Sequence, residues 1–358
     1  MREYFLKLAT DQENDLKANF LKAVLRIISW IYGLAVCFIL FCYRIKVFRT
    51  YVLPKPVISV GNITLGGVGK TPFVKLIAKI LSENNVKPAI LTRGYMGKDF
   101  KGSQVGTQSD EAVELQESLP DAPVLVGANR YASALEGLKK CSPDAFILDD
   151  GFQHWRLKRD LDIVLIDATN PFGNHNLIVR GILREPLSSL KRADVIVLTK
   201  TDAGKDNVWH LKEILLKMNP DFLLCEAVHQ PVCFKEISQQ NIFYKTEFIS
   251  QERICAVSSV GNPSSFEFSL SQLGAQVVRH FAFMDHHIYR PRDIDAVKKF
   301  CAENKITFAV TTQKDAVKLR PFLVNQDEGI KFLALHIEMR ILSGYDQLKN
   351  RILRLFHR

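Results

Sequence analysis

Short apolar runs recur along the chain from residue 57 onward, separated by longer amphipathic stretches. Six runs are nearly continuous in apolar residues and rich in β-branched ones: 57–60, 89–92, 145–148, 163–166, 195–198 and 222–224. Strands buried on both faces of a parallel sheet have this composition. The stretches 71–84, 110–119 and 209–218 have the spacing of helices. The alternation predicts an α/β domain with a doubly wound, mostly parallel sheet.

A second alternating block begins near residue 253. Its predicted strands are 254–257, 276–278 and 307–310, and its predicted helices are 263–273 and 291–304. The polar stretch 231–251 is the expected junction between the blocks. We therefore predict an N-terminal segment over 1–53, a larger α/β domain over 54–245, and a smaller α/β domain over 246–358 that ends in an amphipathic helix.

The N-terminal segment contains an uncharged apolar run, 27–43, with basic residues on both sides. As a helix it would be about 25 Å long, slightly shorter than the hydrocarbon core of a bilayer. Its apolar residues run all round the helix, so we expect burial on every side. A membrane anchor is the preferred interpretation, and a buried core helix is the alternative. The run starts too late for a signal peptide. Whether the helix spans or only inserts is open.

Composition narrows the possible partners. The 358-residue chain carries a formal net charge of +10, which suits an anionic partner such as a lipid or a phosphorylated substrate. It has no run of Arg and Lys and no aromatic RNA-binding motif, so we predict no nucleic-acid partner. The seven cysteines are scattered and include no C-x-x-C pair, which indicates reduced thiols and no zinc site.

The strongest chemical signal follows the first predicted strand. A glycine-rich stretch there opens a predicted helix, which is the context of a phosphate-binding P-loop. Its backbone N–H groups would surround phosphate oxygens, Lys70 would reach the β- and γ-phosphates, and the Thr71 hydroxyl would bind Mg²⁺. The usual pattern has glycine where Thr64 stands. The predicted nucleotide-binding residues are Thr64, Leu65, Gly66, Gly67, Val68, Gly69, Lys70 and Thr71.

Three polar motifs accompany this loop. Asp149 and Asp150 directly follow a predicted strand, where carboxylates can hold Mg²⁺, although a solvated turn is the alternative. Asp110 and Glu111 open a predicted helix, and the residues alone favour a helix cap over a base or metal ligand. A third motif is a histidine pair beside a carboxylate. Such a pair can orient and tune proton transfer, or it can be a surface pair without a function. It comprises Asp285, His286 and His287.

The order of these motifs resembles the tetraacyldisaccharide 4′-kinases of Gram-negative bacteria. The resemblance covers nearly the whole chain up to about Lys318, and it rests most on G-G-x-G-K-T-P and D-D-G-F-Q-H. One position departs from the family pattern, where Gln313 stands in place of an expected glutamate. The remaining matching segments are 61–62, 92–95, 109–111, 129–132, 183–186, 285–287 and 311–318.

The resemblance implies an activity and a location. Such enzymes use ATP and Mg²⁺ to phosphorylate the 4′-hydroxyl of a tetraacylated glucosamine disaccharide 1-phosphate, a step of lipid A biosynthesis. The expected location is the inner membrane, with the catalytic domains on its cytoplasmic face and the lipid disaccharide as partner. We expect a monomer.

The resemblance also implies residue roles. Asp110 acts on the sugar hydroxyl with help from His286 or His287, and Lys70 acts on the phosphates. Thr71, Glu111 and Asp150, with the neighbouring Asp149, surround Mg²⁺. The predicted substrate-contacting residues are Arg130, Gln153, His154, Arg184 and Glu185.

A different class of protein is the alternative. The segment 198–202 follows a predicted strand and matches the [NT]-K-x-D element by which GTPases read guanine, a pattern with a high chance rate. This would indicate a membrane-associated P-loop switch or a metallochaperone. A non-catalytic nucleotide-binding module is disfavoured by the acidic motifs beside the loop. Nucleotide preference discriminates between the kinase and the switch.

Overall fold

A computed structural model describes residues 11, 13, 15–94, 110–239, 241–285, 287–323 and 329–356. The chain divides into two compact units. The first unit comprises Met1–Arg93, Ala122–Val228 and Ile341–Arg358, and the second comprises Gly94–Asp121 and His229–Arg340. This division differs from the sequence-based domains, because 94–121 belongs with the second unit and the C-terminal tail returns to the first.

The first unit is built on a parallel sheet. Its strands lie in the order β7-β6-β5-β1-β4-β2-β3, and each neighbouring pair is parallel. The continuous apolar runs of the sequence form its central strands, which are buried throughout, as predicted. The strands are β1 (Val57–Asn62), β2 (Pro88–Thr92), β3 (Val124–Val126), β4 (Ala145–Asp149), β5 (Leu161–Asp167), β6 (Val195–Thr199) and β7 (Leu223–Glu236).

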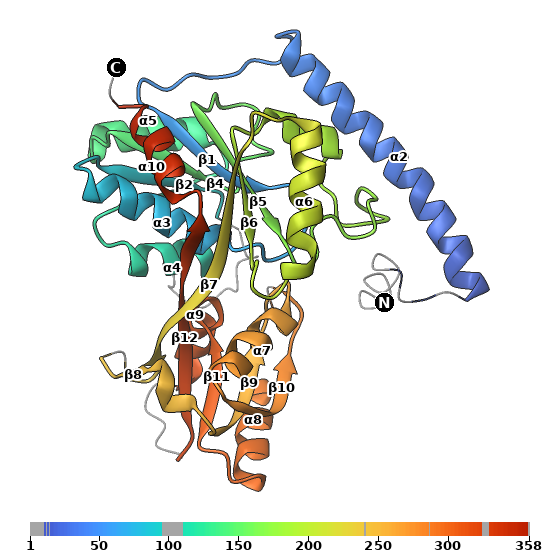
Figure 1. The fold of residues 1–358 in the computed structure, drawn as a ribbon. Coiled ribbons are helices and arrows are strands. Elements are labelled where there is room, and N and C mark those ends of the chain that lie inside the picture. The colour runs from blue at the N-terminus through green and yellow to red at the C-terminus, as the bar shows by residue number, and fades with distance from the viewer. Residues whose placement is uncertain are drawn as a thin grey trace. The chain divides into compact units, whose positions relative to one another are not determined.

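Helices cover this sheet and form its apolar clusters. Phe146 and Leu148 of β4 pack with Ala134 of α5, whereas Val164 of β5 packs with Leu215 of α6. α3 contacts β1, β2 and β4 and follows directly on the phosphate loop (Figure 1). The helices of the first unit, apart from α2, are α3 (Lys70–Glu83), α5 (Arg130–Lys140), η1 (Leu187–Arg192), α6 (Lys205–Met218) and α10 (Tyr345–Leu353).

The second unit has its own parallel strands in the order β10-β9-β11-β12, with β8 antiparallel to β7. α7 packs on β9 and β10, α8 packs on β11, and α4 packs on α9. The strands are β8 (Phe243–Lys245), β9 (Arg253–Ser258), β10 (Gln276–Ala282), β11 (Phe308–Thr312) and β12 (Lys331–Ser343). The helices are α4 (Asp110–Ser118), η2 (Thr246–Ile249), α7 (Pro263–Gln272), α8 (Pro291–Glu303) and α9 (Gln313–Leu323).

α2 (Leu16–Arg44) is a single 29-residue helix in the first unit (Figure 1, blue). Among the described residues it is the helix long and apolar enough to cross a membrane. Only 22% of its most apolar window is buried within the protein, which does not fit the alternative of a buried core helix. The buried side contains small residues such as Ser29 and Gly33, which allow close packing. Ser29 Oγ donates to the Leu177 carbonyl at 2.7 Å, and Tyr32 Oη donates to the Arg184 carbonyl at 2.8 Å.

Candidate active site

The loop between β1 and α3 has the backbone that phosphate binding requires. Gly69, the N-cap of α3, has φ 90°, and Gly66 has φ 119°. Both values lie in the region that favours glycine. Thr64 stands where the motif usually has glycine and forms an antiparallel bridge with Leu183. Because an extended backbone accepts any residue, threonine is tolerated there. Leu65 is half exposed beside it.

The Lys70 side chain lies among oxygen acceptors at the start of α3. Its Nζ donates to Asn62 Oδ1 at 3.1 Å and lies 3.4 Å from Asp150 Oδ1. Arg184 binds both Asp150 oxygens, at 2.8 and 3.1 Å. Burial works to raise the pKa of Asp150, but Lys70 and Arg184 hold it well below its usual range. Asp150 is therefore a carboxylate fixed between two cations that both suit phosphate.

Asp149 and Thr71 supply further oxygen atoms. Asp149 ends β4 in register with Val60 of β1, is almost fully buried, and accepts from Thr92 Oγ1 at 3.2 Å. Aspartate carboxylates and a threonine hydroxyl are the hard oxygen donors that Mg²⁺ prefers. The donor set therefore fits this ion. Among the described residues, no group of three or more His, Cys, Asp or Glu side chains gathers as a metal site, so the Mg²⁺ ligands stay a prediction.

Arg130 gives the same unit a cationic environment, and His154 lies within it. Arg130 begins α5 and is 6% exposed, and its Nε has no hydrogen-bond partner in the described part of the chain. Burial, and then the charge of Arg93, lower the pKa of Arg130. Burial also lowers the pKa of His154, together with Arg130 and other arginines, to about 4. The imidazole is therefore neutral at physiological pH.

Gln153 and Glu185 brace the site from within. Gln153 Nε2 donates to the Asn62 carbonyl at 3.1 Å and to Glu185 Oε1 at 3.2 Å. Arg192 Nη1 donates to Glu185 Oε2 at 2.8 Å. The Glu185 carboxylate has no solvent exposure, so the structure does not support its predicted contact with substrate. Its role is to hold Gln153 and Arg192 in place.

Two residues that sequence reasoning did not assign to the site hold the phosphate loop from β6. Thr199 Oγ1 donates to the Val68 carbonyl at 2.9 Å, and Lys200 Nζ donates to the Gly67 carbonyl at 2.9 Å. Lys200 also pairs with Asp167 at the end of β5. The sequence signal was the segment 198–202, interpreted there as a guanine-reading element. Its first two polar side chains support the loop backbone.

In the second unit, α9 holds α4 near both of its ends. Lys314 Nζ lies 3.7 Å from Glu111 Oε1 and donates to Asp285 Oδ1 at 3.1 Å. Arg320 binds both carboxylate oxygens of Glu117, at 2.7 and 3.1 Å. Burial works to lower the pKa of Lys314, but Asp285 and Glu111 raise it above its ordinary value. Lys314 therefore joins two predicted site motifs, and no sequence argument singled it out.

The histidine motif is partly described. His287 Nε2 lies 2.9 Å from Asp293 Oδ2, and its ring stacks on Phe283 with centroids 4.6 Å apart. A carboxylate of this kind fixes the orientation of an imidazole. His286 and the side chain of Asp110 lie outside the described residues, so their predicted pairing stays a prediction. The backbone places Asp110 at the first position of α4.

A buried carboxylate stabilises the region around Lys314. Asp315 has no solvent exposure and accepts from the Ser259 backbone N–H at 2.8 Å and from Thr312 Oγ1 at 2.9 Å. Lys318 Nζ donates to Ser259 Oγ at 2.8 Å and to Asp315 Oδ1 at 3.1 Å. A satisfied network of this kind holds its backbone in one arrangement. It ties β9 to the first turn of α9.

The parallel sheet, the glycine loop opening α3, and the Lys70–Asp150–Arg184 cluster define a P-loop enzyme of the kinase type. The profile of a family described as tetraacyldisaccharide-1-P 4′-kinase matches residues 21–357. The chain belongs to this family, and it is a kinase of lipid A biosynthesis.

Individual relatives agree with this assignment. The chain is 33% identical to a tetraacyldisaccharide 4′-kinase of Halothermothrix orenii, over 98% of this chain and 96% of that protein. It is 35% identical to one of Syntrophus aciditrophicus, over 84% of each protein. Among solved structures, it resembles Aquifex aeolicus LpxK in complex with ATP, with TM-score 0.70, 29% identity, and coverage of 94% and 99%.

Proposed function

We propose that this chain transfers the γ-phosphoryl group of ATP to the 4′-hydroxyl of a tetraacylated glucosamine disaccharide 1-phosphate. The product is lipid IVA, a precursor of lipid A. The observation that carries the proposal is the Lys70–Asp150–Arg184 cluster at a phosphate loop, in a chain of this family. Phosphoryl transfer needs positioned cations more than covalent help from the protein. The cluster provides them.

The first unit has the groups that bind and neutralise phosphate. Loop N–H groups and the N-terminus of α3 hold the phosphates, and Lys70 and Arg184 stabilise the charge that develops on the transferred group. Thr71, Asp149 and Asp150 would hold Mg²⁺; when bound, the ion neutralises phosphate charge. Arg130 and His154 are the proposed contacts to the anionic or sugar part of the acceptor.

The second unit has the proposed base. Asp110 accepts the proton of the sugar hydroxyl as the bond to phosphorus forms. One histidine of the Asp285 motif orients or tunes that carboxylate. The Lys314 ammonium between Asp285 and Glu111 keeps these acidic side chains from repelling one another.

The test is a kinase assay with labelled ATP and detergent-dispersed tetraacyldisaccharide 1-phosphate. We expect labelled lipid from the wild-type protein with ATP and little with GTP. Nucleotide hydrolysis with a strong GTP preference and no labelled lipid would overturn the proposal in favour of the switch. Omitting the disaccharide is the matched control, because a kinase then transfers nothing.

We propose further that α2 lies in the interface of the inner membrane, with the catalytic units on the cytoplasmic face. Its exposed stripe includes Leu34 (72% exposed) and Phe38 (65% exposed), while its other side packs on the folded unit. A spanning helix would carry the contacts with Leu177 and Arg184 into hydrocarbon, where polar groups are costly. A helix apolar on one side suits in-plane insertion.

Two variants test this membrane contact. Leu34→Glu combined with Phe38→Glu places charge on the exposed stripe and should lower the membrane-bound fraction at least about tenfold in sedimentation with vesicles. Phe243→Glu, at an exposed phenylalanine in β8, is the matched control and should sediment as wild type does. Equal membrane binding of the wild type and both variants would show that the exposed stripe of α2 does not anchor the protein.

A further inference from the structure

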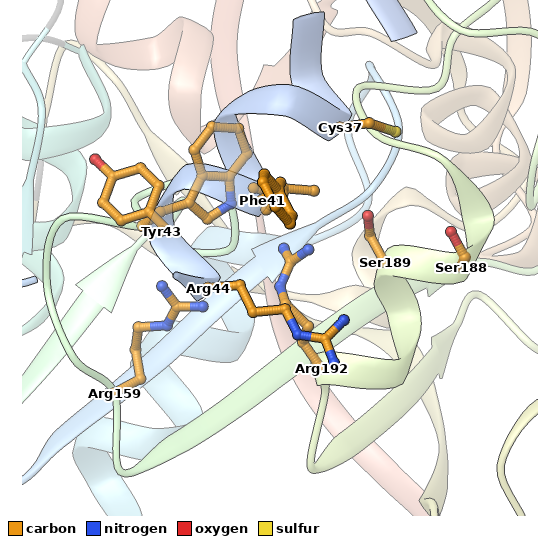
Figure 2. Close-up of a pocket in the computed structure, with 10 residues that line it drawn as sticks. Cys37, Phe41, Tyr43, Arg44, Arg159, Ser188, Ser189 and Arg192 are labelled. Atoms are coloured by element: carbon orange, nitrogen blue, oxygen red, sulfur yellow. The ribbon is translucent and has the colours of Figure 1, made fainter. Parts of the chain in front are cut away.

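The C-terminal part of α2 and two other segments of the first unit line an open cavity of about 550 Å³. Figure 2 shows three arginine side chains on one part of its wall and aromatic side chains of α2 on another. This volume is in the range of small-molecule sites. Its lining residues are Cys37, Leu40, Phe41, Tyr43, Arg44, Trp155, Arg159, Ser188, Ser189 and Arg192.

The polar wall is cationic. Arg159 Nη2 donates to Asp162 Oδ2 at 2.8 Å, and Arg192 is fixed by Glu185, so two of the three guanidinium groups are held in place by carboxylates. No hydrogen bond or ion pair is found for Arg44 in the described part of the chain. Arg44 is exposed, and an exposed guanidinium beside two other arginines can bind a phosphate through charge-assisted hydrogen bonds.

The apolar wall is continuous with the exposed face of α2. Phe41 lines the cavity and is 54% exposed, and Tyr43 packs on Trp155 with ring centroids 6.0 Å apart. Trp155 Nε1 is shielded from solvent and has no hydrogen-bond partner among the described residues. The cavity therefore combines a cationic end with an apolar exit toward the stripe of Leu34 and Phe38.

We propose that this cavity binds one anionic phospholipid of the surrounding leaflet. Its phosphate lies against Arg44, Arg159 and Arg192, and its acyl chains follow the exposed stripe of α2. The proposal rests on the proposed membrane contact of α2. It adds a discrete site, with one lipid per chain, to the general attraction between basic residues and an anionic surface.

The cavity is separate from the phosphate loop. Arg192 lines the cavity, with its guanidinium carbon 4.4 Å from the centre of the Phe152 ring and its Nη1 on Glu185. Phe152 and Glu185 are both fully buried. This buried layer lies between Arg192 and Gln153, which contacts Asn62 beside the loop. We therefore assign the cavity to a lipid of the bilayer, and the phosphorylated acceptor is the competing occupant that the experiment below distinguishes.

Native mass spectrometry of the full-length protein in a neutral detergent tests the site. With dioleoyl phosphatidylglycerol added, we expect one retained lipid per chain, and none with dioleoyl phosphatidylcholine. Arg44→Gln should weaken retention at least about tenfold, because a charge-assisted hydrogen bond is lost. The matched control is Arg26→Gln, which removes the same charge from an exposed position of the same helix outside the cavity and should retain the lipid.

A second variant and a competition complete the test. Ser188→Trp fills the cavity without changing its charge and should also abolish retention. Equal loss in Arg44→Gln and Arg26→Gln, or no stoichiometric lipid at all, overturns the site. Displacement of the phospholipid by the tetraacyldisaccharide 1-phosphate overturns the assignment to a bilayer lipid. Lipid retention needs no catalysis, so Lys70→Ala, which tests the kinase, should retain the lipid.

Discussion

The phosphate loop of the first unit and the α4–α9 region of the second are held in place differently. The residues that shape the loop are adjacent in the sequence, because Gly69 gives the turn and Lys70 follows it directly, while Thr199 and Lys200 support the loop backbone. The α4 region depends on a residue far along the chain, because Lys314 holds Glu111 and Asp285. The residues of the phosphate loop can therefore be recognised as a short sequence motif. The residues of the α4–α9 region come together only in the folded protein.

This difference predicts different responses to mutation. A change at Lys70 would remove a group that we propose contacts phosphate directly, while Thr199 and Lys200 keep the loop backbone in place. A change in the α4 region alters both position and charge of groups that act through one another. Losses there should be smaller and more strongly coupled.

The largest expected effect is that of Lys70→Ala. Removing the ammonium takes charge from the β- and γ-phosphates, and we expect phosphoryl transfer to fall by at least about a thousandfold. Labelled-ATP kinetics measure the loss, and circular dichroism checks that the fold is intact. Lys79→Ala, on an exposed position of the same helix, should retain activity. Activity of Lys70→Ala within a few-fold of wild type would reject the loop assignment.

Asp110→Ala should have the next largest effect. Loss of general-base help lowers kcat by about 10²–10⁴-fold, with little change in ATP affinity. One of His286→Ala and His287→Ala should be similarly impaired. Steady-state kinetics at saturating ATP give the losses for each variant.

The double variant tests whether the two motifs act as a unit. Asp110→Ala combined with the impaired histidine variant should fall far short of the product of the two losses. Fully multiplicative losses, or a loss seen only in ATP binding, would leave Asp110 as the helix cap that the residues alone favoured. His287→Ala has a second expected effect, lower thermal stability, because its ring contacts both Asp293 and Phe283.

Much of the first unit could be predicted from the sequence because its signals are local. The buried strands β1, β4, β5 and β6 are short apolar runs, and a run of this kind has few other stable locations than a parallel sheet. The strand β7 was missed beyond its first residues, because His229, Gln230 and Pro231 resemble a loop. Its length carries the chain into the second unit, and so the predicted boundary fell too late.

The candidate site could likewise be predicted only where its sequence signals are local. The sequence indicated Lys70, Asp149 and Asp150 from their positions after strands, but it gave Glu185 a substrate contact that its complete burial does not support. It gave neither Lys314 nor Lys200 an ion-pair partner, since a lysine has no local pattern that marks one. Such pairings are decided by tertiary structure and are not visible in spacing.

Lys314→Met tests the α4–α9 region and should have a smaller effect than Asp110→Ala. Without the ammonium, Glu111 and Asp285 repel the neighbouring base, so its pKa rises and the acidic limb of kcat/KM should move up by about one pH unit. We expect kcat at neutral pH to fall about tenfold or less. The pH–rate profile measures the shift, and Lys314→Arg, which keeps the charge, should restore it. A lower rate with an unmoved limb would indicate a purely structural role.

The smallest expected effect concerns His154, and it measures the cationic field of the first unit. Its pKa is about 4 in the folded protein against an ordinary value of 6.5, first because of burial and then because of Arg130 and other arginines. Below about pH 6.5 the unfolded chain binds a proton that the folded protein does not bind. The free energy of unfolding should therefore fall between about pH 6.5 and 4 and be unaffected by this group above that range.

His154→Gln removes the titration but keeps a neutral polar side chain. A pKa difference of this size is worth at most about 3 kcal/mol, and solvent screening of the partly exposed ring reduces it to about 1–2 kcal/mol. Urea unfolding of the two proteins at pH 7.5 and 4.5 should show a smaller acid-side loss in the variant by that amount. His210→Gln, on the exposed surface of α6, is the matched control and should leave the loss in place. Parallel pH profiles for His154→Gln and wild type would mean that burial and the surrounding arginines together shift the pKa of His154 less than their arrangement indicates.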